Sequence, residues 1–260
     1  MRRLLGIVAV VAAVGLLMAL PVTGEGTNLI VNGSFEQDGG GGVGAGWTPF
    51  NNGGHSQYGY ALDTREATLF DGSRSQLVAI KGGGVEADRY AGIYQTVQVV
   101  PGADYHLTIH GVVCSTEGSP EASGYGYRVQ WAIDYSGGSD WQALDPSAWH
   151  ELDWYEWPLD APGYLETFST DIKATSGKLT LFIRGWKKWR TANSEGHFSF
   201  DGISLVGPAP TGQQQQQQQG AQLPTTGAGL ILPGVGVLLG VAALARAGRL
   251  LLAHRRTRGF

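Results

Sequence analysis

The amino-acid sequence predicts an all-β fold, a sandwich of short strands, and three observations point to it. Residues 27–206 are rich in Gly, Tyr, Trp, Thr and Val, which favour strands and the tight turns between them. Short runs alternate between apolar and polar residues with period two, and turn-forming clusters separate these runs. We find no segment with the period of an amphipathic helix.

Six runs are expected to form strands. They span residues 90–99, 105–114, 125–135, 167–174, 178–185 and 197–206. Turns are expected at 101–104, 136–139 and 175–177, where Pro, Gly and Ser gather. Strands of this length, separated by turns of this kind, are typical of a β-sandwich.

The alternation also assigns side chains to faces. In the run 125–135, one face carries Tyr127, Val129, Trp131, Ile133 and Tyr135, and the other carries Arg128, Gln130 and Asp134. In the run 178–185, Leu179, Leu181 and Ile183 oppose Thr180, Phe182 and Arg184. Because the apolar face of such a strand is buried, Trp131 is predicted to be a core residue.

The two ends of the chain resemble targeting segments rather than parts of this fold. Residues 1–26 join a positive start to an apolar run and a small, turn-forming end, the pattern of a secretory signal peptide. A retained membrane helix is the alternative. Residues 207–222 hold two prolines and seven consecutive glutamines, which predicts a disordered linker. The folded domain is therefore expected at 27–206.

The domain between these segments is acidic. Residues 27–210 hold eleven Lys and Arg against twenty-one Asp and Glu, a formal charge of −10, whereas the whole chain has −4. We expect no nucleic-acid partner, because the phosphate backbone repels such a domain.

Cys114 is the only cysteine, so the chain forms no internal disulfide. Its apolar neighbours predict that Cys114 is a small buried residue.

A signal in three parts follows the linker. Residues 228–245 form an apolar run of transmembrane length, and 246–260 form a basic tail expected in the cytoplasm. The motif before them, at 223–227, is Leu223, Pro224, Thr225, Thr226 and Gly227. This order resembles the LPXTG signal of proteins that sortases join to the cell wall.

The resemblance implies secretion, cleavage by sortase after Thr226 and attachment of the domain to peptidoglycan at the cell surface. A C-terminal membrane helix that is never cleaved is the alternative. Both interpretations place the folded domain outside the cell.

Short motifs within the domain resemble one superfamily. They are NLIVNGSFE at 28–36 with Gly46-Trp47 after it, AGIYQTV at 91–97, and FDGISLV at 200–206. Their order and spacing resemble those of carbohydrate-binding modules of the galactose-binding-like jelly-roll superfamily. The resemblance implies a jelly-roll β-sandwich with a carbohydrate ligand.

The same resemblance implies a structural calcium ion held by Glu36 and Asp201 together with backbone carbonyls, since hard oxygen ligands suit Ca²⁺. The alternative is that Glu36 faces solvent and Asp201 caps a turn.

Sugar sites in such modules combine aromatic rings with polar side chains, and the chain has eight Trp and ten Tyr. Trp131 and Tyr105 are assigned to the core, and Trp149, Trp154, Tyr155 and Trp157 to an aromatic loop folded over one sheet. The candidate sugar-binding residues are Trp47, Tyr58, Trp186 and Trp189, with Arg128, Gln130 and Arg184 as polar partners. Packing in the core is the alternative for each ring.

Enzymatic activity is not expected. Glu151, Asp153 and Glu156 offer carboxylates in one segment, but nothing in the sequence sets two of them at the separation that glycoside hydrolysis needs. Two hypotheses remain. The first is a surface-anchored, non-catalytic carbohydrate-binding protein. The second is a structural or adhesive surface protein whose jelly roll binds no sugar and is held by an uncleaved membrane helix.

Overall fold

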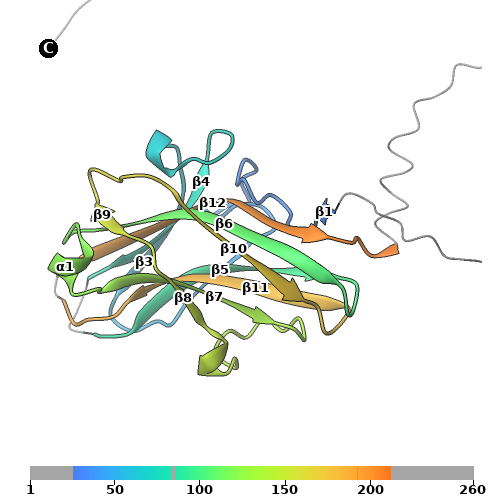
Figure 1. Ribbon diagram of the computed structural model, residues 1–260. Helices are drawn as coiled ribbons and strands as arrows, with labels where there is room; N and C mark the ends of the chain where they lie inside the picture. Colours follow the sequence, from blue (N-terminus) through green and yellow to red (C-terminus); the bar gives the residue numbers. More distant parts are fainter. Residues whose placement is uncertain (1–25, 83–85, 192, 212–260) are drawn as a thin grey trace, which may run out of the picture. The chain divides into compact units, whose positions relative to one another are not determined.

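We describe the protein from a computed structural model, which covers residues 26–82, 86–191 and 193–211 (Figure 1). The predicted sorting motif at 223–227, the transmembrane segment at 228–245 and the basic tail at 246–260 lie outside these residues, as do residues 1–25. Within the described ranges, no helix has the length and hydropathy needed to cross a membrane.

The described residues form two β-sheets. The larger sheet runs in the order β10-β6-β12-β4-β3, with β1 added to β12 and β9 to β6. Its strands are β1 (Thr27–Asn28), β3 (Gln57–Asp63), β4 (Ser75–Lys81), β6 (Asp104–Ser115), β9 (Glu156–Pro158), β10 (Glu166–Lys173) and β12 (Glu195–Gly207). All its pairings are antiparallel except β6 with β9.

The smaller sheet has five strands in the order β2-β5-β11-β7-β8, all antiparallel. They are β2 (Thr48–Asn51), β5 (Arg89–Gln98), β7 (Tyr127–Asp134), β8 (His150–Leu152) and β11 (Lys178–Lys187). The helical elements are short: η1 (Glu66–Thr68), α1 (Pro120–Ser123) and η2 (Pro146–Ala148). Figure 1 shows the two sheets as stacked layers, with β6, β10 and β12 in one and β5, β7 and β11 in the other.

The core lies between these layers and follows the alternation in the sequence. Leu179, Leu181 and Ile183 of β11 are buried in it, and Trp131 of the neighbouring β7 is buried beside them. Each such side chain contributes roughly 1.5–3 kcal/mol when it is fully removed from water. The sheets approach so closely that a Cβ at Gly185 would lie 2.1 Å from the Phe198 ring, so only glycine fits there.

The predicted β-sandwich is confirmed, since the described residues form two sheets between which the chain crosses repeatedly, as in a jelly roll. All six predicted strands are present, as β5, β6, β7, β10, β11 and β12. The described residues contain six strands that were not predicted: β1, β2, β3, β4, β8 and β9. Pro49 interrupts β2, which lies at the edge of its sheet, and β4 is buried on both faces and so lacks alternation.

Trp47 is a core residue. Its ring is 6% exposed, and it packs 5.5 Å from the Phe35 ring. Its Nε1 donates to the backbone oxygen of Asn32 at 3.2 Å. A ring covered in this way cannot stack on a sugar, so the structure corrects the expectation that Trp47 contacts a ligand.

We predict that Trp47→Ala lowers the free energy of unfolding by about 3–5 kcal/mol, because it leaves a cavity in a packed core. Urea denaturation followed by circular dichroism measures the change. Trp189→Ala is the matched control: that ring is 48% exposed, and its removal should change stability by about 1 kcal/mol or less. Equal losses for the two variants would contradict the core assignment of Trp47.

Candidate functional site

The outer face of the five-stranded sheet carries the side chains that alternate with the core residues. On β11 these are Phe182, Arg184 and Trp186. The strand register sets Arg184 opposite Gln130 of β7 and Gly92 of β5, and it sets Trp186 between Arg128 and Tyr90. Aromatic and polar side chains from three strands thus share this face.

The segment between β7 and β8 folds over this face with two tryptophans. The Trp141 ring lies 5.0 Å from Phe50 of β2, and the Trp149 ring lies 6.2 Å from Phe182 of β11. The two indoles meet edge to face at 6.5 Å. Asp145 caps η2 in this segment by accepting from the Ser147 N–H at 2.8 Å, which helps to hold the loop in place.

A groove of about 330 Å³ lies between this loop and the sheet. It is lined by Asn52, Tyr90, Trp141, Gln142, Leu144, Pro146, Trp149 and Arg184. The composition is apolar and aromatic with a few polar groups, as in small-ligand sites, whose volumes are roughly 300–1,000 Å³. We call this the aromatic groove.

Arg184 is held between two rings of the aromatic groove. Its guanidinium carbon lies 3.5 Å from the centre of the Trp149 ring and 3.9 Å from that of Tyr90. Its Nε and Nη2 donate to Gln130 Oε1 at 2.9 and 2.7 Å. Burial lowers the pKa of the Arg184 guanidinium to about 10, so the group remains a cation at neutral pH. Its attraction to the faces of both rings offsets part of the lost hydration.

Trp186 extends the row of rings beyond Tyr90. The two rings stack with centres 5.8 Å apart, and Trp186 Nε1 donates to Asp88 Oδ1 at 3.1 Å. Lys188 Nζ lies 4.6 Å from the Trp186 ring centre. The order Trp186, Tyr90, Arg184, Trp149 therefore forms a continuous stack across the outer face.

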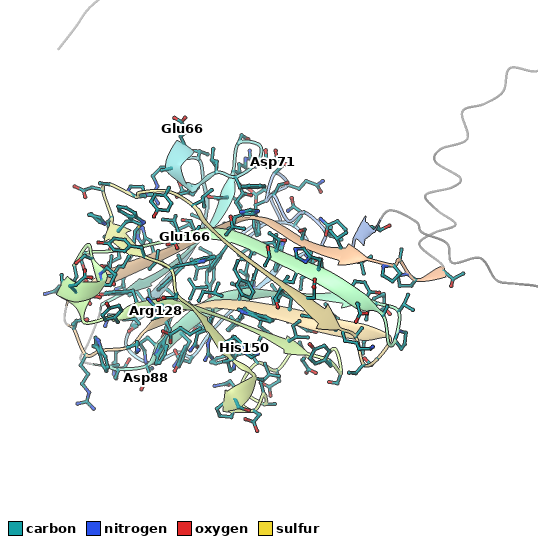
Figure 2. All side chains as sticks on the ribbon, viewed as in Figure 1. Glu66, Asp71, Asp88, Arg128, His150 and Glu166 are labelled. Atoms are coloured by element: carbon teal, nitrogen blue, oxygen red, sulfur yellow. The ribbon has the colours of Figure 1, made fainter. Side chains whose placement is uncertain are left out.

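The predicted partner Arg128 lies on the same face, and its charge is already paired. Its Nε donates to Glu151 at 2.7 Å, its Nη2 to Asp153 at 2.8 Å and its Nη1 to the Trp154 carbonyl at 3.2 Å. Figure 2 shows Arg128 toward the α1 end of the domain. There it lines a smaller hollow of about 210 Å³ with residues that include Tyr125 and Tyr155.

The acidic segment around Arg128 serves the fold. Glu151 and Asp153 both bind Arg128. Glu156 is buried, and it accepts hydrogen bonds from the hydroxyls of Ser115 and Ser123. Burial raises the pKa of the Glu156 carboxyl. Glu151 and Asp153 thus join the β8 region to β7, and Glu156 joins β9 to β6 and α1.

Two other predicted rings, Tyr58 and Trp189, do not line the aromatic groove. Tyr58 belongs to β3 of the other sheet, but its hydroxyl contacts Asn52 Oδ1 at 3.1 Å, and Asn52 lines the groove. Trp189 is exposed, and its Nε1 donates to the Gly124 carbonyl at 2.9 Å. Sugar binding by Tyr58, Trp186 and Trp189 stays a prediction, and Trp189 would contact a ligand only at a site other than the aromatic groove. The structure brings Arg184, Gln130 and Trp186 together and leaves Trp189 outside the groove lining.

Several groove residues were not among the candidates. Tyr90 begins a predicted strand and occupies the same alternating face as Tyr94, which is a signal that its ring points outward. Trp149 was assigned to an aromatic loop over one sheet, and the structure confirms this for Trp149, whereas Trp154 is in the core. Trp141 lies outside any run that alternates between apolar and polar residues, so its position over the sheet could not be predicted.

The two predicted calcium ligands hold one loop. Glu36 accepts from the N–H groups of Ser73 and Arg74, both at 2.8 Å, and from the Ser73 hydroxyl. Asp201 accepts from the N–H groups of Phe70 and Asp71 at 2.6 and 3.1 Å. Hydrogen bonds from Ser73 lower the pKa of Glu36, while burial raises that of Asp201.

These contacts leave calcium at Glu36 and Asp201 a prediction. Among the described residues, no group of three or more His, Cys, Asp or Glu could hold a metal ion. Calcium takes roughly six to eight oxygens, so most ligands would have to be backbone carbonyls or water. Moreover, N–H donors already face both carboxylates, and a cation would have to displace them.

Calcium removal tests this prediction. If a calcium ion stabilises the domain, EDTA lowers the melting temperature by about 2–4 °C for each kcal/mol of binding free energy. Added Ca²⁺ then restores the melting temperature, and Mg²⁺ at the same concentration serves as the control. Identical melting curves with and without EDTA would exclude a structural calcium ion.

Solved structures similar to this chain include carbohydrate-binding modules with a β-sandwich fold. The module TmCBM61, in complex with β-1,4-galactotriose, is 13% identical over 70% of this chain and 99% of its own, with a TM-score of 0.42. A CBM4 module is 11% identical over 69% of this chain and 99% of its own, with a TM-score of 0.41. The tandem CBM22-1–CBM22-2 domain of Paenibacillus barcinonensis Xyn10C is 17% identical over 73% of this chain and 49% of its own, with a TM-score of 0.40.

No protein-family model matches the chain, and no curated protein matches it. The structural similarities therefore concern the β-sandwich alone. The functional argument rests on the residues of the aromatic groove.

Proposed function

We propose that the protein is a non-catalytic carbohydrate-binding protein displayed at the cell surface, with the aromatic groove as its sugar site. One observation carries the proposal. Tyr90, Trp141 and Trp149 line a single groove together with the polar side chains of Asn52, Gln142 and Arg184.

This mixture of groups suits a pyranose ring. The axial C–H bonds of a sugar make an apolar face that packs on the electron-rich face of an aromatic ring. The hydroxyl groups around the ring need hydrogen-bond donors and acceptors, because burying them without partners is unfavourable. In the aromatic groove the indoles would supply the stacking surface, and the amide of Gln142 would supply both a donor and an acceptor. The amide of Asn52 already bonds Tyr58, Asp88 and Tyr90.

The rings that line the groove are also held in place by contacts within the protein, without a ligand. Trp149 is stacked on Arg184, which Gln130 holds from the neighbouring strand. Trp141 is packed on Phe50. Since rings that are already ordered lose little conformational entropy on binding, this arrangement favours affinity.

Surface display is the second half of the proposal and rests on the sequence. A signal peptide, an acidic folded domain, a glutamine-rich linker, the motif Leu223–Gly227, an apolar run and a basic tail follow one another. Sortase would cleave after Thr226 and join the domain to peptidoglycan, and the linker would hold the domain away from the wall.

Mass spectrometry of the mature protein tests the anchoring. We expect a C-terminal peptide that ends at Thr226 and carries a cell-wall fragment. A mature chain that retains residues 228–260 would instead support a membrane anchor that is never cleaved.

We predict that Trp141→Ala weakens binding to an oligosaccharide ligand roughly 10- to 30-fold, because a central aromatic contact is worth about 1–2 kcal/mol or more. A glycan array identifies ligands of the unmodified protein, and isothermal titration then compares the variant. The expected loss needs no loss of fold, since Trp141 lies on the outer face rather than in the core.

Trp189→Ala is the matched control, because it removes an exposed indole that does not line the aromatic groove. We expect its affinity to stay within about twofold of the unmodified protein. Binding that is lost in Trp189→Ala and kept in Trp141→Ala would move the sugar site away from the groove. No binding to any glycan would favour a structural or adhesive protein.

A further inference from the structure

The aromatic groove contains a buried cation that no carboxylate neutralises. Arg184 is 7% exposed, and its only hydrogen-bond partner among the described residues is the neutral amide of Gln130. No Asp or Glu in the described ranges forms an ion pair with it. Burying a charged group without an opposite charge is unfavourable unless other contacts compensate.

Three other arginines in the described part of the chain, Arg65, Arg89 and Arg128, form ion pairs with acidic side chains. Arg65 binds Asp63 at 2.7 Å, and Arg128 binds both Glu151 and Asp153. Arg128 is as deeply buried as Arg184 and lies on the same sheet face. The two buried arginines therefore differ in one respect: the chain itself supplies carboxylates to Arg128 and supplies none to Arg184.

The free side of the Arg184 guanidinium is the part suited to a carboxylate. Nε and Nη2 both donate to a single oxygen, Gln130 Oε1. Among the described residues, Nη1 has no hydrogen-bond partner, and Arg184 lines the groove. The Nη1 and Nη2 edge of an arginine can bind both oxygens of a carboxylate with two parallel hydrogen bonds.

We propose that the aromatic groove prefers an acidic sugar, and that Arg184 binds a carboxylate carried on the pyranose ring, as in a uronic acid. This inference rests on the proposed sugar-binding function and names its ligand class. Tyr90 and Trp149 cover the two faces of the guanidinium, which keeps water away and strengthens its attraction for a carboxylate.

The overall charge of the domain does not oppose this preference at short range. Its formal charge of −10 is spread over about 180 residues, and salt screens it beyond about 8–10 Å. No acidic residue is among the described residues that line the aromatic groove. Beside it, Asp88 accepts a hydrogen bond from Trp186, and Glu151 is paired with Arg128. Arg184 is therefore the charged side chain that a ligand in the aromatic groove would contact.

The test compares matched ligands that differ only at carbon 6. The probes are β-1,4-linked glucose and galactose trimers and the same trimers with each CH₂OH oxidised to a carboxylate. Isothermal titration with the full chain measures both members of each pair. We expect at least one oxidised trimer to bind tenfold or more tightly than its neutral partner.

The outcomes separate the two claims. If trimers bind but no oxidised trimer binds at least tenfold more tightly than its neutral partner, the acidic-sugar inference is overturned and the proposed sugar site stands. If no trimer of either kind binds, both claims lose their support.

The variant Gln130→Glu tests the role of Arg184 directly, because it supplies the missing carboxylate from within the chain. We expect the tenfold preference to fall to about onefold, because the carboxylate at position 130 would already occupy the guanidinium of Arg184. Gln98→Glu makes the same change at an exposed position at the end of β5 and should keep the preference. An unchanged preference in Gln130→Glu would show that Arg184 only positions Tyr90 and Trp149.

Discussion

Strand β11 is the element on which both the core and the aromatic groove depend. It is the central strand of its sheet and pairs with β5 on one side and β7 on the other. Because alternate side chains of a strand point to opposite faces, one strand supplies Leu181 and Ile183 to the core and Arg184 to the groove. A shift of one residue in this register would exchange the two sets and destroy both.

The loop between β7 and β8 forms the second wall of the aromatic groove, opposite the outer face of the sheet. Its two tryptophans lie on rings and on a cation that the strands present, so the loop is ordered by the same face that it covers. The stack from Trp186 to Trp149 joins β11, β5 and this loop. The buried guanidinium at its centre is stable because two ring faces and one amide replace its water.

Much of the fold could be predicted from the sequence, because five or more alternating residues identify a half-buried strand. The runs that became β7 and β11 are of this kind, and the residues assigned to their inward faces lie in or against the core. Strand β4 was missed because burial on both faces removes the alternation. Short strands such as β2 carry too few residues for a period to appear.

The candidate site was predictable only in part. Period two placed Arg128, Gln130 and Arg184 on one face, which the register confirms. It could not show that Arg128 is paired with acids from β8 and the residue after it, since that contact joins distant parts of the chain. The approach of Trp149 to Arg184 is equally non-local and depends on the path of an irregular loop. Trp47 was misplaced because a tryptophan in a Gly-rich segment has no periodic neighbours that reveal its burial.

The most direct test of this account follows all tryptophan side chains at once during a ligand titration. Nuclear magnetic resonance resolves the indole N–H signal of each of the eight tryptophans, and single substitutions assign them. The account predicts that an oligosaccharide shifts the signals of Trp141 and Trp149 at one common affinity and leaves Trp47 and Trp189 unchanged. Shifts at Trp189 with none at Trp141 and Trp149 would contradict the aromatic groove as the ligand site.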